Sequence, residues 1–266
     1  SKVFISEIDK NALVKGKSIK KLRKRKIKVI VKSFGNQTRH INKVFFKSLN
    51  NNLPYITLKI ASTADGKIAT KSKKSKWITN SVSRQHGHMF RAQNDCMLVG
   101  RGTIEADNPA LDCRLSGLES FSPDLFLLDS TISIPNHYKI FSNHSRNVFV
   151  FYSDGKKRSN LNKKNIKYIK VSKKGSELSL REILNKITNL GYMRILVEGG
   201  SHLSGSLLKN NYVNEIQWFR ASKIIGKGGV DAVSDMGVSN MKSTKNFVLL
   251  DSKNYGNDIL TIYRKG

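Results

Sequence analysis

Acidic residues, cysteine and proline are all scarce in this sequence. Its 266 residues include 19 Asp and Glu against 48 Lys and Arg, two cysteines and four prolines. Two cysteines, Cys96 and Cys113, are too few for a disulfide framework or for a zinc fold built on several cysteines. Hydrophobic residues still reach 38%, which is enough for a real core and argues against a disordered chain. The length fits one large domain or two small ones.

Long hydrophobic runs are also missing. The longest apolar stretch is the five-residue run from Val148 to Tyr152, which is far too short for a transmembrane helix. The chain begins with Ser-Lys-Val rather than with an apolar signal-like segment, so nothing indicates secretion and we expect a cytoplasmic location. Because the first residue is not methionine, we expect either a processed chain or a part of a longer protein.

The shortage of acidic residues leaves a formal charge of +29, which first suggests a nucleic acid or a phosphorylated ligand as the partner. Residues 1–50 hold 15 Lys and Arg against two acidic residues, a net of +13, and the densest run is 17–26. We favour a solvated helix there, with Ile19 and Leu22 facing inward, because charge runs are usually solvated faces. The basic residues are also mostly lysine, 35 of 48, which is typical of compositional drift. Nucleic acid is therefore not the partner that we favour.

The first fifth of the chain has the pattern of a small β-α-β piece followed by a helix. Apolar spacing predicts strands over 2–8 and 27–31 and helices over 17–26 and 37–51. The run from Asn50 to Pro54 then breaks the chain. We place a boundary there, which divides the chain into residues 1–52 and 53–266.

Strands and helices alternate after this boundary. Strands are predicted over 55–60, 96–99, 125–128, 148–152, 166–171, 194–198, 213–219, 246–250 and 258–263. Helices are predicted over 80–93, with Thr79 or Asn80 as the N-cap, and over 179–190 and 201–210. Such alternation predicts an α/β fold with a largely parallel sheet, and the strands that close the chain predict an antiparallel edge.

A diglycine between a strand and a helix is the strongest sign of a binding site. Glu198-Gly199-Gly200 follows a buried strand, and the helix predicted from Ser201 begins at once. The free N–H groups at a helix N-terminus attract a phosphate, and glycine lets it approach the backbone. An ordinary tight turn is the alternative. The pattern does not fit the dinucleotide fingerprint Gly-x-Gly-x-x-Gly, so a conventional Rossmann domain is disfavoured.

Three further clusters contain residue types suited to ligands. Lys59 lies near a strand end, before an Asp-Gly turn. Trp77 precedes a helix, where its ring could either cover a flat ligand or lie in the core. The segment 100–114 is predicted to be a glycine-rich loop that ends in Arg114. Arg91 and Arg114 have guanidinium forks suited to a phosphate, although surface arginines would have the same pattern.

Metal ligands are not grouped in the sequence. His86 and His88 flank Gly87 in a predicted helix, where residues two apart face in different directions, so we expect no shared metal. The sequence contains no His-x-Glu and no Pro-Cys-x-x-Cys. We therefore expect neither a zinc deaminase site nor a resident metal.

Six ordered motifs resemble one family. They are Leu58-Lys59-x-Ala61 with Asp65-Gly66, Ser75-x-Trp77-Ile78-Thr79, Arg91-Ala92-Gln93, Gly102-Thr103-x-x-x-Asp107-x-Pro109-x-Leu111-x-x-Arg114, Leu128-Asp129-Ser130 and Val197-Glu198-Gly199-Gly200. In this order they are similar to the reductase domain of the bifunctional riboflavin-biosynthesis deaminase/reductase. The resemblance covers residues 54–266 and implies a dihydrofolate-reductase-like three-layer α/β sandwich with a mostly parallel central sheet. It also implies a homodimer and the NADPH-dependent reduction of 5-amino-6-(5-phosphoribosylamino)uracil to its ribitylamino product.

Residues 1–50 resemble the last β-α-β piece of that family's deaminase domain, through Glu7-Ile8-Asp9-Lys10-Asn11, Gly16-Lys17-Ser18-Ile19 and Leu22, so residues 1–52 would be a remnant of that domain with a linker helix. The family's zinc motifs are absent, so we expect a deaminase remnant without deaminase activity. Two other interpretations stay open. One is a reductase of the same fold that acts on the diamino-pyrimidinone phosphate or on dihydrofolate, and the other is a basic nucleic-acid-binding module that uses residues 15–28.

The resemblance implies roles for individual residues. NADPH would be held by Ala61, Trp77, Thr103, Asp107, Ser130 and the segment Gly200, Ser201, His202, Leu203, Ser204, Gly205 and Ser206. The substrate would be held by Ser75, Arg91, Leu111, Arg114 and Glu198, with the two arginines on the ribose phosphate and Glu198 on a polar edge. Lys59 or Asp107 would donate the proton, so Lys59, Asp107 and Glu198 are the predicted catalytic residues. Asn80 and Asn108 depart from the family, in which Gly and Asp are common.

Overall fold

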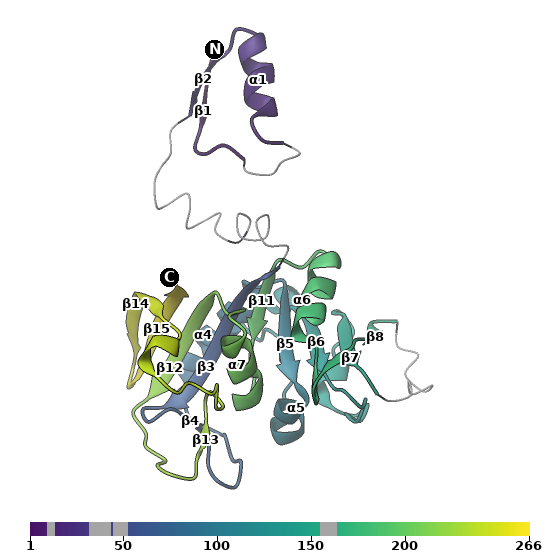
Figure 1. Ribbon diagram of the computed structural model, residues 1–266, viewed down its shortest axis with the longest axis vertical. Helices are drawn as coiled ribbons and strands as arrows, with labels where there is room; N and C mark the ends of the chain where they lie inside the picture. Colours follow the sequence, from purple (N-terminus) through teal and green to yellow (C-terminus); the bar gives the residue numbers. More distant parts are fainter. Residues whose placement is uncertain (10–13, 32–43, 45–52, 155–163) are drawn as a thin grey trace. The chain divides into compact units, whose positions relative to one another are not determined.

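The computed structural model describes residues 1–9, 14–31, 44, 53–154 and 164–266. The chain divides into two compact units, Ser1–Tyr55 and Ile56–Gly266 (Figure 1). Within the described part of the chain, no helix is both long and apolar enough to cross a membrane. The helix predicted over 37–51 falls outside the described residues except for Val44.

The N-terminal unit contains a β-α-β piece. β1 (Lys2–Ile5) and β2 (Lys28–Val31) pair in parallel, and α1 (Lys17–Lys24) lies between them in the chain. Ile19 of α1 is buried, whereas the Lys and Arg side chains of residues 17–26 are exposed. The basic run is therefore the solvated helix face that the sequence predicts. β1 ends at Ile5, before the predicted end at residue 8.

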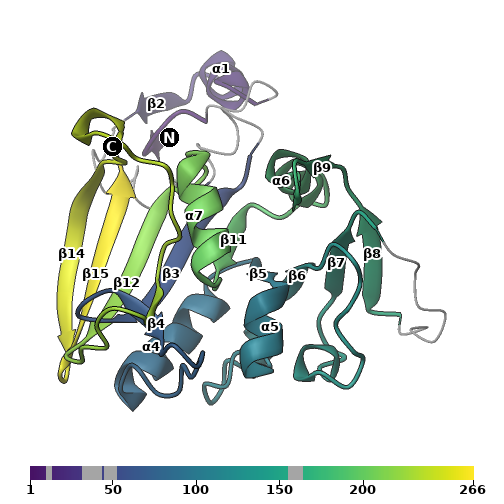
Figure 2. The same ribbon diagram turned by 60° about the horizontal axis from the view of Figure 1, so that its bottom comes forward.

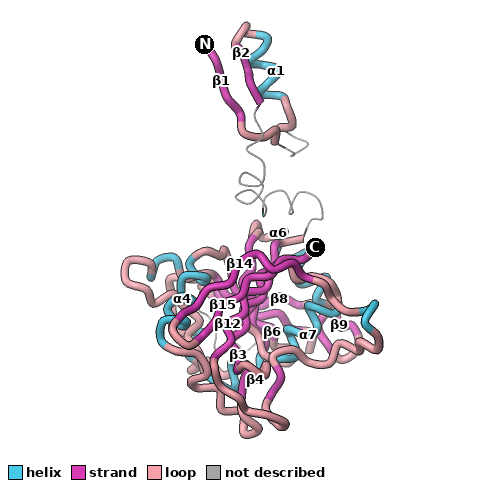
Figure 3. Tube along the Cα trace, turned by 90° about the vertical axis from the view of Figure 1, so that its left-hand side faces the viewer, coloured by secondary structure: helices cyan, strands magenta, loops and turns pink. Residues whose placement is uncertain are grey.

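A large sheet organises the second unit, with its strands in the order β14-β15-β12-β3-β11-β5-β6-β7-β8. The strands are β3 (Tyr55–Thr63), β5 (Cys96–Gly100), β6 (Asp124–Leu128), β7 (Val148–Tyr152), β8 (Ile166–Lys170), β11 (Arg194–Val197), β12 (Glu215–Ala221), β14 (Phe247–Tyr255) and β15 (Asp258–Lys265). β12 pairs in parallel with β3, and the strands from β11 to β8 pair in parallel along the row. β15 pairs antiparallel with both β12 and β14, and these strands form the near edge in Figure 3. The predicted parallel sheet with an antiparallel edge is confirmed.

Helices cover both faces of this sheet (Figures 1 and 2). α4 (Ser81–Ala92) lies on one face, and α6 (Leu180–Asn189) and α7 (Ser201–Lys209) lie on the other. Right-handed crossovers produce this split, because α4 leads the chain from β3 to β5, whereas α6 and α7 lead it back across the sheet. The result is the three-layer α/β sandwich that the sequence predicts.

Short elements complete the second unit. β4 (Lys67–Ala69) pairs with β13 (Val230–Asp231), and β9 (Lys173–Lys174) pairs with β10 (Glu177–Leu178). Single 3-10 turns span Glu119–Phe121, Lys139–Phe141 and Met241–Ser243. Asn80, one of the two predicted N-caps of α4, accepts a hydrogen bond from the Ser83 N–H at 2.9 Å. This departure from the family therefore has a local structural role, since it satisfies an N–H of the first helical turn.

The core lies on both sides of the central strands. Every residue of β7, from Val148 to Tyr152, is buried, as expected for a parallel strand covered on both faces. Phe126 of β6 stacks on Phe149 of β7, with ring centroids 4.6 Å apart. Phe90 of α4 joins the same buried cluster as the central strands. This packing fixes the strand ends, where the site lies.

The segment 100–114 differs from its prediction as a glycine-rich loop. Residues Arg101–Asp107 form a helix, α5, and only the following residues are irregular. Gly102 weakens a helix by about 1 kcal/mol relative to alanine, which is why the sequence indicated a loop. Ile104 is fully buried in the core cluster and offsets that cost. The segment therefore presents helical residues, among them Thr103 and Asp107, as well as the irregular residues Leu111 and Arg114, to the site.

Candidate functional site

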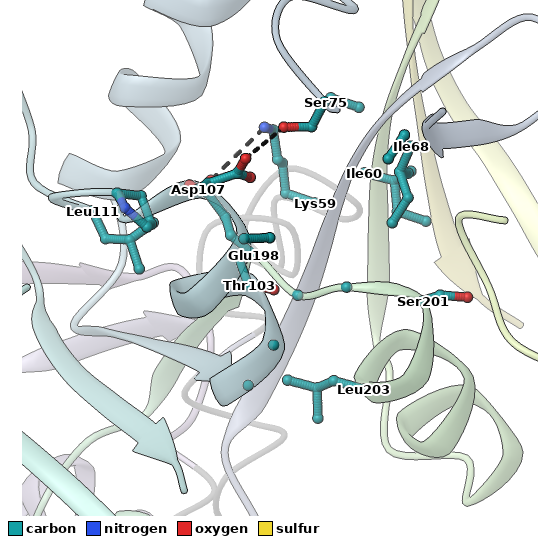
Figure 4. A pocket seen from close by; sticks show the side chains of 18 of the residues that line it. Lys59, Ile60, Ile68, Ser75, Thr103, Asp107, Leu111, Glu198, Ser201 and Leu203 are labelled. Atoms are coloured by element: carbon teal, nitrogen blue, oxygen red, sulfur yellow. Dashed lines mark hydrogen bonds and ion pairs between the residues drawn. The ribbon is translucent and has the colours of Figure 1, made fainter. Parts of the chain in front are cut away.

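A cavity of about 1040 Å³ opens at the carboxyl ends of the parallel strands. Residues of β3, residues at or just after the ends of β11, β5 and β6, and residues of α4, α5 and α7 line it, and Figure 4 shows part of this lining. Ligands of open α/β sheets bind in such crevices. The predicted site residues that line the cavity are Lys59, Ala61, Ser75, Trp77, Arg91, Thr103, Asp107, Leu111, Arg114, Ser130, Glu198, Gly200, Ser201, His202, Leu203 and Ser206. Ser204 and Gly205 do not line it.

Three charged side chains meet inside the cavity, and we call Lys59, Arg91 and Glu198 the buried ion cluster. Arg91 Nε donates to Glu198 Oε1 at 2.7 Å, and Arg91 Nη2 donates to Glu198 Oε2 at 2.9 Å. Lys59 Nζ lies 3.8 Å from Glu198 Oε2. Each of the three side chains is less than one fifth exposed, at 18%, 13% and 12%. One carboxylate therefore pairs with two cations that are largely shielded from water.

The buried ion cluster shifts the proton affinities of its members. Burial alone would raise the pKa of Glu198, but Arg91 and Lys59 outweigh it and lower that pKa to about 2. Burial lowers the pKa of Lys59, although Glu198 acts in the opposite direction. Glu198 is therefore ionised at any ordinary working pH, and the Lys59 ammonium gives up its proton more readily than an ordinary lysine does.

Arg91 has an arrangement that the sequence did not indicate. All three of its guanidinium nitrogens donate within the protein, because Nη1 also donates to the Asp112 carbonyl oxygen at 2.9 Å. Its fork thus joins Glu198 to the segment that carries Leu111 and Arg114. Arg114 itself is 64% exposed at the cavity wall, where it can turn toward an anion. The contribution of Arg91 to phosphate binding stays a prediction.

A second polar pair lies beside the buried ion cluster. Ser75 Oγ donates to Asp107 Oδ1 at 2.6 Å, which ties the segment before α4 to the last residue of α5. Dashed lines in Figure 4 mark this bond and the Lys59–Glu198 ion pair. Two predicted proton donors, Lys59 and Asp107, therefore line one cavity.

The N-terminus of α7 faces the same cavity. Gly200 is its N-cap, and no side chain of the described residues caps the first turn there. A Cβ on Gly200 would lie 3.5 Å from Thr103 Oγ1, so α5 and the start of α7 are close neighbours. Ser201 begins the helix in Figure 4. Free N–H groups beside a hydroxyl form an arrangement suited to a phosphate.

Comparison with known proteins places the chain in a family. The family profile of the RibD C-terminal domain matches residues 54–261, which is more than half of the chain. The chain belongs to this family. The riboflavin biosynthesis protein RibD of Aquifex aeolicus is 31% identical over 270 residues, which cover 99% of this chain and 72% of that protein.

Solved structures of the RibD family have the same fold. The Acinetobacter baumannii RibD structure superposes with a TM-score of 0.88 at 26% identity, and the match covers 100% of this chain and 73% of that one. A Thermotoga maritima protein, described as a diaminohydroxyphosphoribosylaminopyrimidine deaminase/5-amino-6-(5-phosphoribosylamino)uracil reductase, gives a TM-score of 0.83 at 27% identity and a coverage of 100% and 72%. The predicted dihydrofolate-reductase-like α/β fold is confirmed.

Trp77 is exposed in this RibD-family chain rather than buried in its core. Its side chain is 63% exposed and lines the cavity. The Arg84 guanidinium carbon lies 4.3 Å from the centroid of the Trp77 ring, and Arg84 Nη1 donates to the Thr79 carbonyl oxygen at 2.6 Å. The core alternative is therefore excluded, and Arg84 holds the aromatic face at the cavity wall.

The sequence missed two residues on the same face of α4 as Arg91. Arg84, His88 and Arg91 follow at i, i+4 and i+7, and all three line the cavity. His88 Nδ1 lies 3.0 Å from the Asp112 carbonyl oxygen and 3.2 Å from the Arg114 N–H. Helical spacing from Arg91 was the signal that could have found them. His86 packs instead against Phe90, so the two histidines do face apart as predicted.

Arg146 is a further residue that the motifs do not contain. It is only 3% exposed, and it donates from Nη1 to the Leu111 carbonyl oxygen and from Nη2 to the Ala110 carbonyl oxygen, each at 2.5 Å. Asn108 and Leu111 both have a positive φ, 42° and 55°, which costs conformational energy. Arg146 therefore holds a strained segment in the shape that brings Leu111 to the cavity.

Ser204 and Gly205 do not line the cavity, although both belong to the segment 200–206 that is predicted to hold the cofactor. Ser204 is 1% exposed and its Oγ donates to the Gly200 carbonyl oxygen at 3.2 Å. A Cβ on Gly205 would meet Ser234 Oγ at 2.1 Å and the Ser234 carbonyl oxygen at 3.1 Å. A helix completes a turn every ~3.6 residues, so consecutive side chains point to different sides and a run of seven consecutive residues cannot all reach one ligand.

Replacing Gly205 with alanine should destabilise the fold. The added methyl would overlap Ser234, and overpacking of this kind costs about 1–3 kcal/mol. Urea unfolding measures the loss. Gly102→Ala is the matched control, because a Cβ there meets nothing within 4 Å and alanine favours a helix. A Gly205→Ala variant as stable as the wild type would show that α7 does not pack against Ser234 in this way.

Proposed function

We propose that this chain is an NADPH-dependent reductase of riboflavin biosynthesis, which converts 5-amino-6-(5-phosphoribosylamino)uracil into its ribitylamino product. The name of the Thermotoga relative supports the substrate, and the names of the RibD relatives support the pathway. The observation that carries the proposal is the buried ion cluster inside a cavity that also receives the N-terminus of α7, which no side chain of the described residues caps. Such a cavity offers both an anion site and a proton donor.

The residues present fit a nicotinamide dinucleotide. The start of α7 would bind the diphosphate, with Thr103 beside it, and the exposed Trp77 ring offers a flat surface to an aromatic group. Ala61 and Ser130, two residues with small side chains, also line the cavity. NADPH, when bound, supplies a hydride from C4 of its nicotinamide.

The remaining chemistry belongs to side chains of this protein. Reduction of the opened sugar, or of its imine, adds one hydride at C1′ and one proton at the neighbouring heteroatom. We assign that proton to the Lys59 ammonium, because burial makes it more acidic. Glu198 keeps the ammonium in place and offers a carboxylate oxygen to an N–H of the substrate. Arg114 and Ser75 would bind the phosphate and a hydroxyl.

A direct assay tests this function. The purified chain is mixed with NADPH and 5-amino-6-(5-phosphoribosylamino)uracil, and the absorbance of NADPH is followed beside a reaction with the diamino-pyrimidinone phosphate. We expect oxidation with the uracil substrate and much slower oxidation with the diamino compound. A preference for the diamino compound would assign the reaction to the alternative order of steps, and no oxidation with either compound would refute a pyrimidine reductase.

The pH profile of turnover should fall on the alkaline side. Burial lowers the pKa of Lys59 below its ordinary value of 10.5, so its ammonium loses the proton at a lower pH than a surface lysine does. Measured kcat against pH would contradict the assignment of Lys59 as proton donor if no alkaline decline occurred below 10.5.

Glu198 governs the stability of the fold at acid pH. Its folded pKa is about 2 against an ordinary 4.5, so its contribution to stability is complete above pH 4.5 and is lost as the pH falls toward 2.

We also propose that residues 1–52 correspond to the end of a deaminase domain and that residues 53–266 form the reductase domain and a homodimer. The edge strand β14 supports the dimer, because Val248, Leu249 and Leu250 are 57%, 54% and 42% exposed. An exposed apolar edge strand favours pairing with a second copy.

A further inference from the structure

The strands under the cavity follow one another in a fixed order, so the cavity has one end at β3 and another at β6. Lys59 belongs to β3 and Glu198 follows β11, whereas Arg101 follows β5 and Ser130 lies just after β6. The order β3-β11-β5-β6 separates the two ends by three strand spacings, or about 14 Å. The start of α7, which would bind the diphosphate, follows β11 between these ends. A dinucleotide with its nicotinamide near Lys59 would therefore place its adenosine half over the ends of β5 and β6.

A cation surrounded by hydroxyl groups lies at that far end. Arg101 Nη1 donates to Thr131 Oγ1 at 3.1 Å and to Ser133 Oγ at 3.3 Å, and Ser130 lines the cavity beside them. Arg101 Nε is also 3.5 Å from Glu105 Oε1. The Arg101 side chain is 42% exposed, so it is not locked in the core and can turn toward a ligand in the cavity.

We propose that Arg101 binds the 2′-phosphate of NADPH and thereby sets the preference for NADPH over NADH. This inference rests on the proposed function, because it takes the adenosine half of the cofactor to lie at the ends of β5 and β6. Lys59 and Arg91 cannot serve, since Glu198 holds both of them at the other end of the cavity. A guanidinium next to hydroxyl groups is an effective phosphate ligand, through charge-assisted hydrogen bonds.

Kinetics with two cofactors test the proposal. Arg101→Gln should raise the KM for NADPH by about tenfold or more, because a hydrogen bond to a charged group contributes this much or more. The kcat and the KM for NADH should stay within about twofold of the wild type, because NADH has no 2′-phosphate for Arg101 to bind. Arg101→Lys, which keeps the charge, should recover part of the preference. Arg194→Gln is the matched control, since it removes an exposed arginine at the amino end of β11, which does not line the cavity.

The outcomes separate this inference from the proposed function. If the wild type is active but Arg101→Gln changes the KM values for NADPH and NADH by the same factor, or changes neither, Arg101 does not bind the 2′-phosphate. Lys139→Ala is a second arm, because Lys139 also lines the cavity. A loss of preference in that variant alone would overturn the assignment to Arg101. Calorimetry of NADPH and NADH without substrate gives the same ratio, so an inactive wild type would refute only the reductase assignment.

Discussion

Glu198→Gln should remove most of the reductase activity and also lower the melting temperature. The amide cannot neutralise Lys59 and Arg91, which are only 18% and 13% exposed and would remain buried without their carboxylate. Removal of one partner from a buried ion pair typically costs about 3–5 kcal/mol. We expect kcat/KM to fall by about a hundredfold or more, since the substrate also loses its acceptor and Lys59 its position. Steady-state kinetics and thermal unfolding measure the two effects.

Glu119→Gln is the matched control for this variant. Glu119 lies on an exposed 3-10 turn and is not among the residues that line the cavity. Its replacement should leave both kcat/KM and the melting temperature close to the wild type. The account of the buried ion cluster fails if Glu198→Gln behaves like this control.

Lys59→Met should remove most of the turnover while the protein stays folded. The methionine side chain has a similar length and no charge, and Glu198 keeps its two hydrogen bonds from Arg91. Loss of a general acid lowers kcat by about 10²–10⁴-fold. The Kd for NADPH should change little, because Lys59 acts on the substrate. The melting temperature should fall less than in Glu198→Gln, since no buried cation is left without a partner.

Two variants make the result of Lys59→Met specific. Lys253→Met removes an exposed lysine of β14 that pairs with Asp251, and it should be as active as the wild type. Asp107→Asn tests the other predicted proton donor. If Lys59→Met keeps near-wild-type kcat and Asp107→Asn loses it, the proton comes from Asp107 and not from Lys59.

The elements of the fold could be predicted because their signals are local. Helix α6 begins at its Ser179 cap and buries Ile183, Leu184 and Ile187, which recur at the spacing of one helix face and support the helix predicted over 179–190. Strand β7 is a run of five apolar residues that both faces of the sheet bury. Helix α5 was missed because its glycine suggests a loop, and only burial of Ile104 in the tertiary structure reverses that preference.

The composition of the site could be predicted, but its pairings could not. Motifs supplied Lys59, Arg91 and Glu198 as separate residues, and Arg91 and Glu198 are 107 positions apart in the chain. Their hydrogen bonds depend on the packing of α4 against the end of β11, which no local pattern encodes. Arg146 was invisible for the same reason, since its partners are backbone carbonyls that could belong to any residue. Ser204 and Gly205 do not line the cavity, although the motif that predicts cofactor contacts runs continuously through them.

The place of β11 in the sheet bears on how the chain is completed during synthesis. β3 and β5 leave the ribosome well before Arg194–Val197, yet β11 is the strand that lies between them. Until it arrives, their facing edges have no partner within the chain, and such edges attract other strands. Lys59 likewise has no Glu198 to pair with until this residue, which directly follows β11, has been synthesised. The connection of β3 to β5 and the assembly of the ion cluster therefore depend on the same late segment, and a nascent chain that stops short of β11 should be both open to aggregation and inactive.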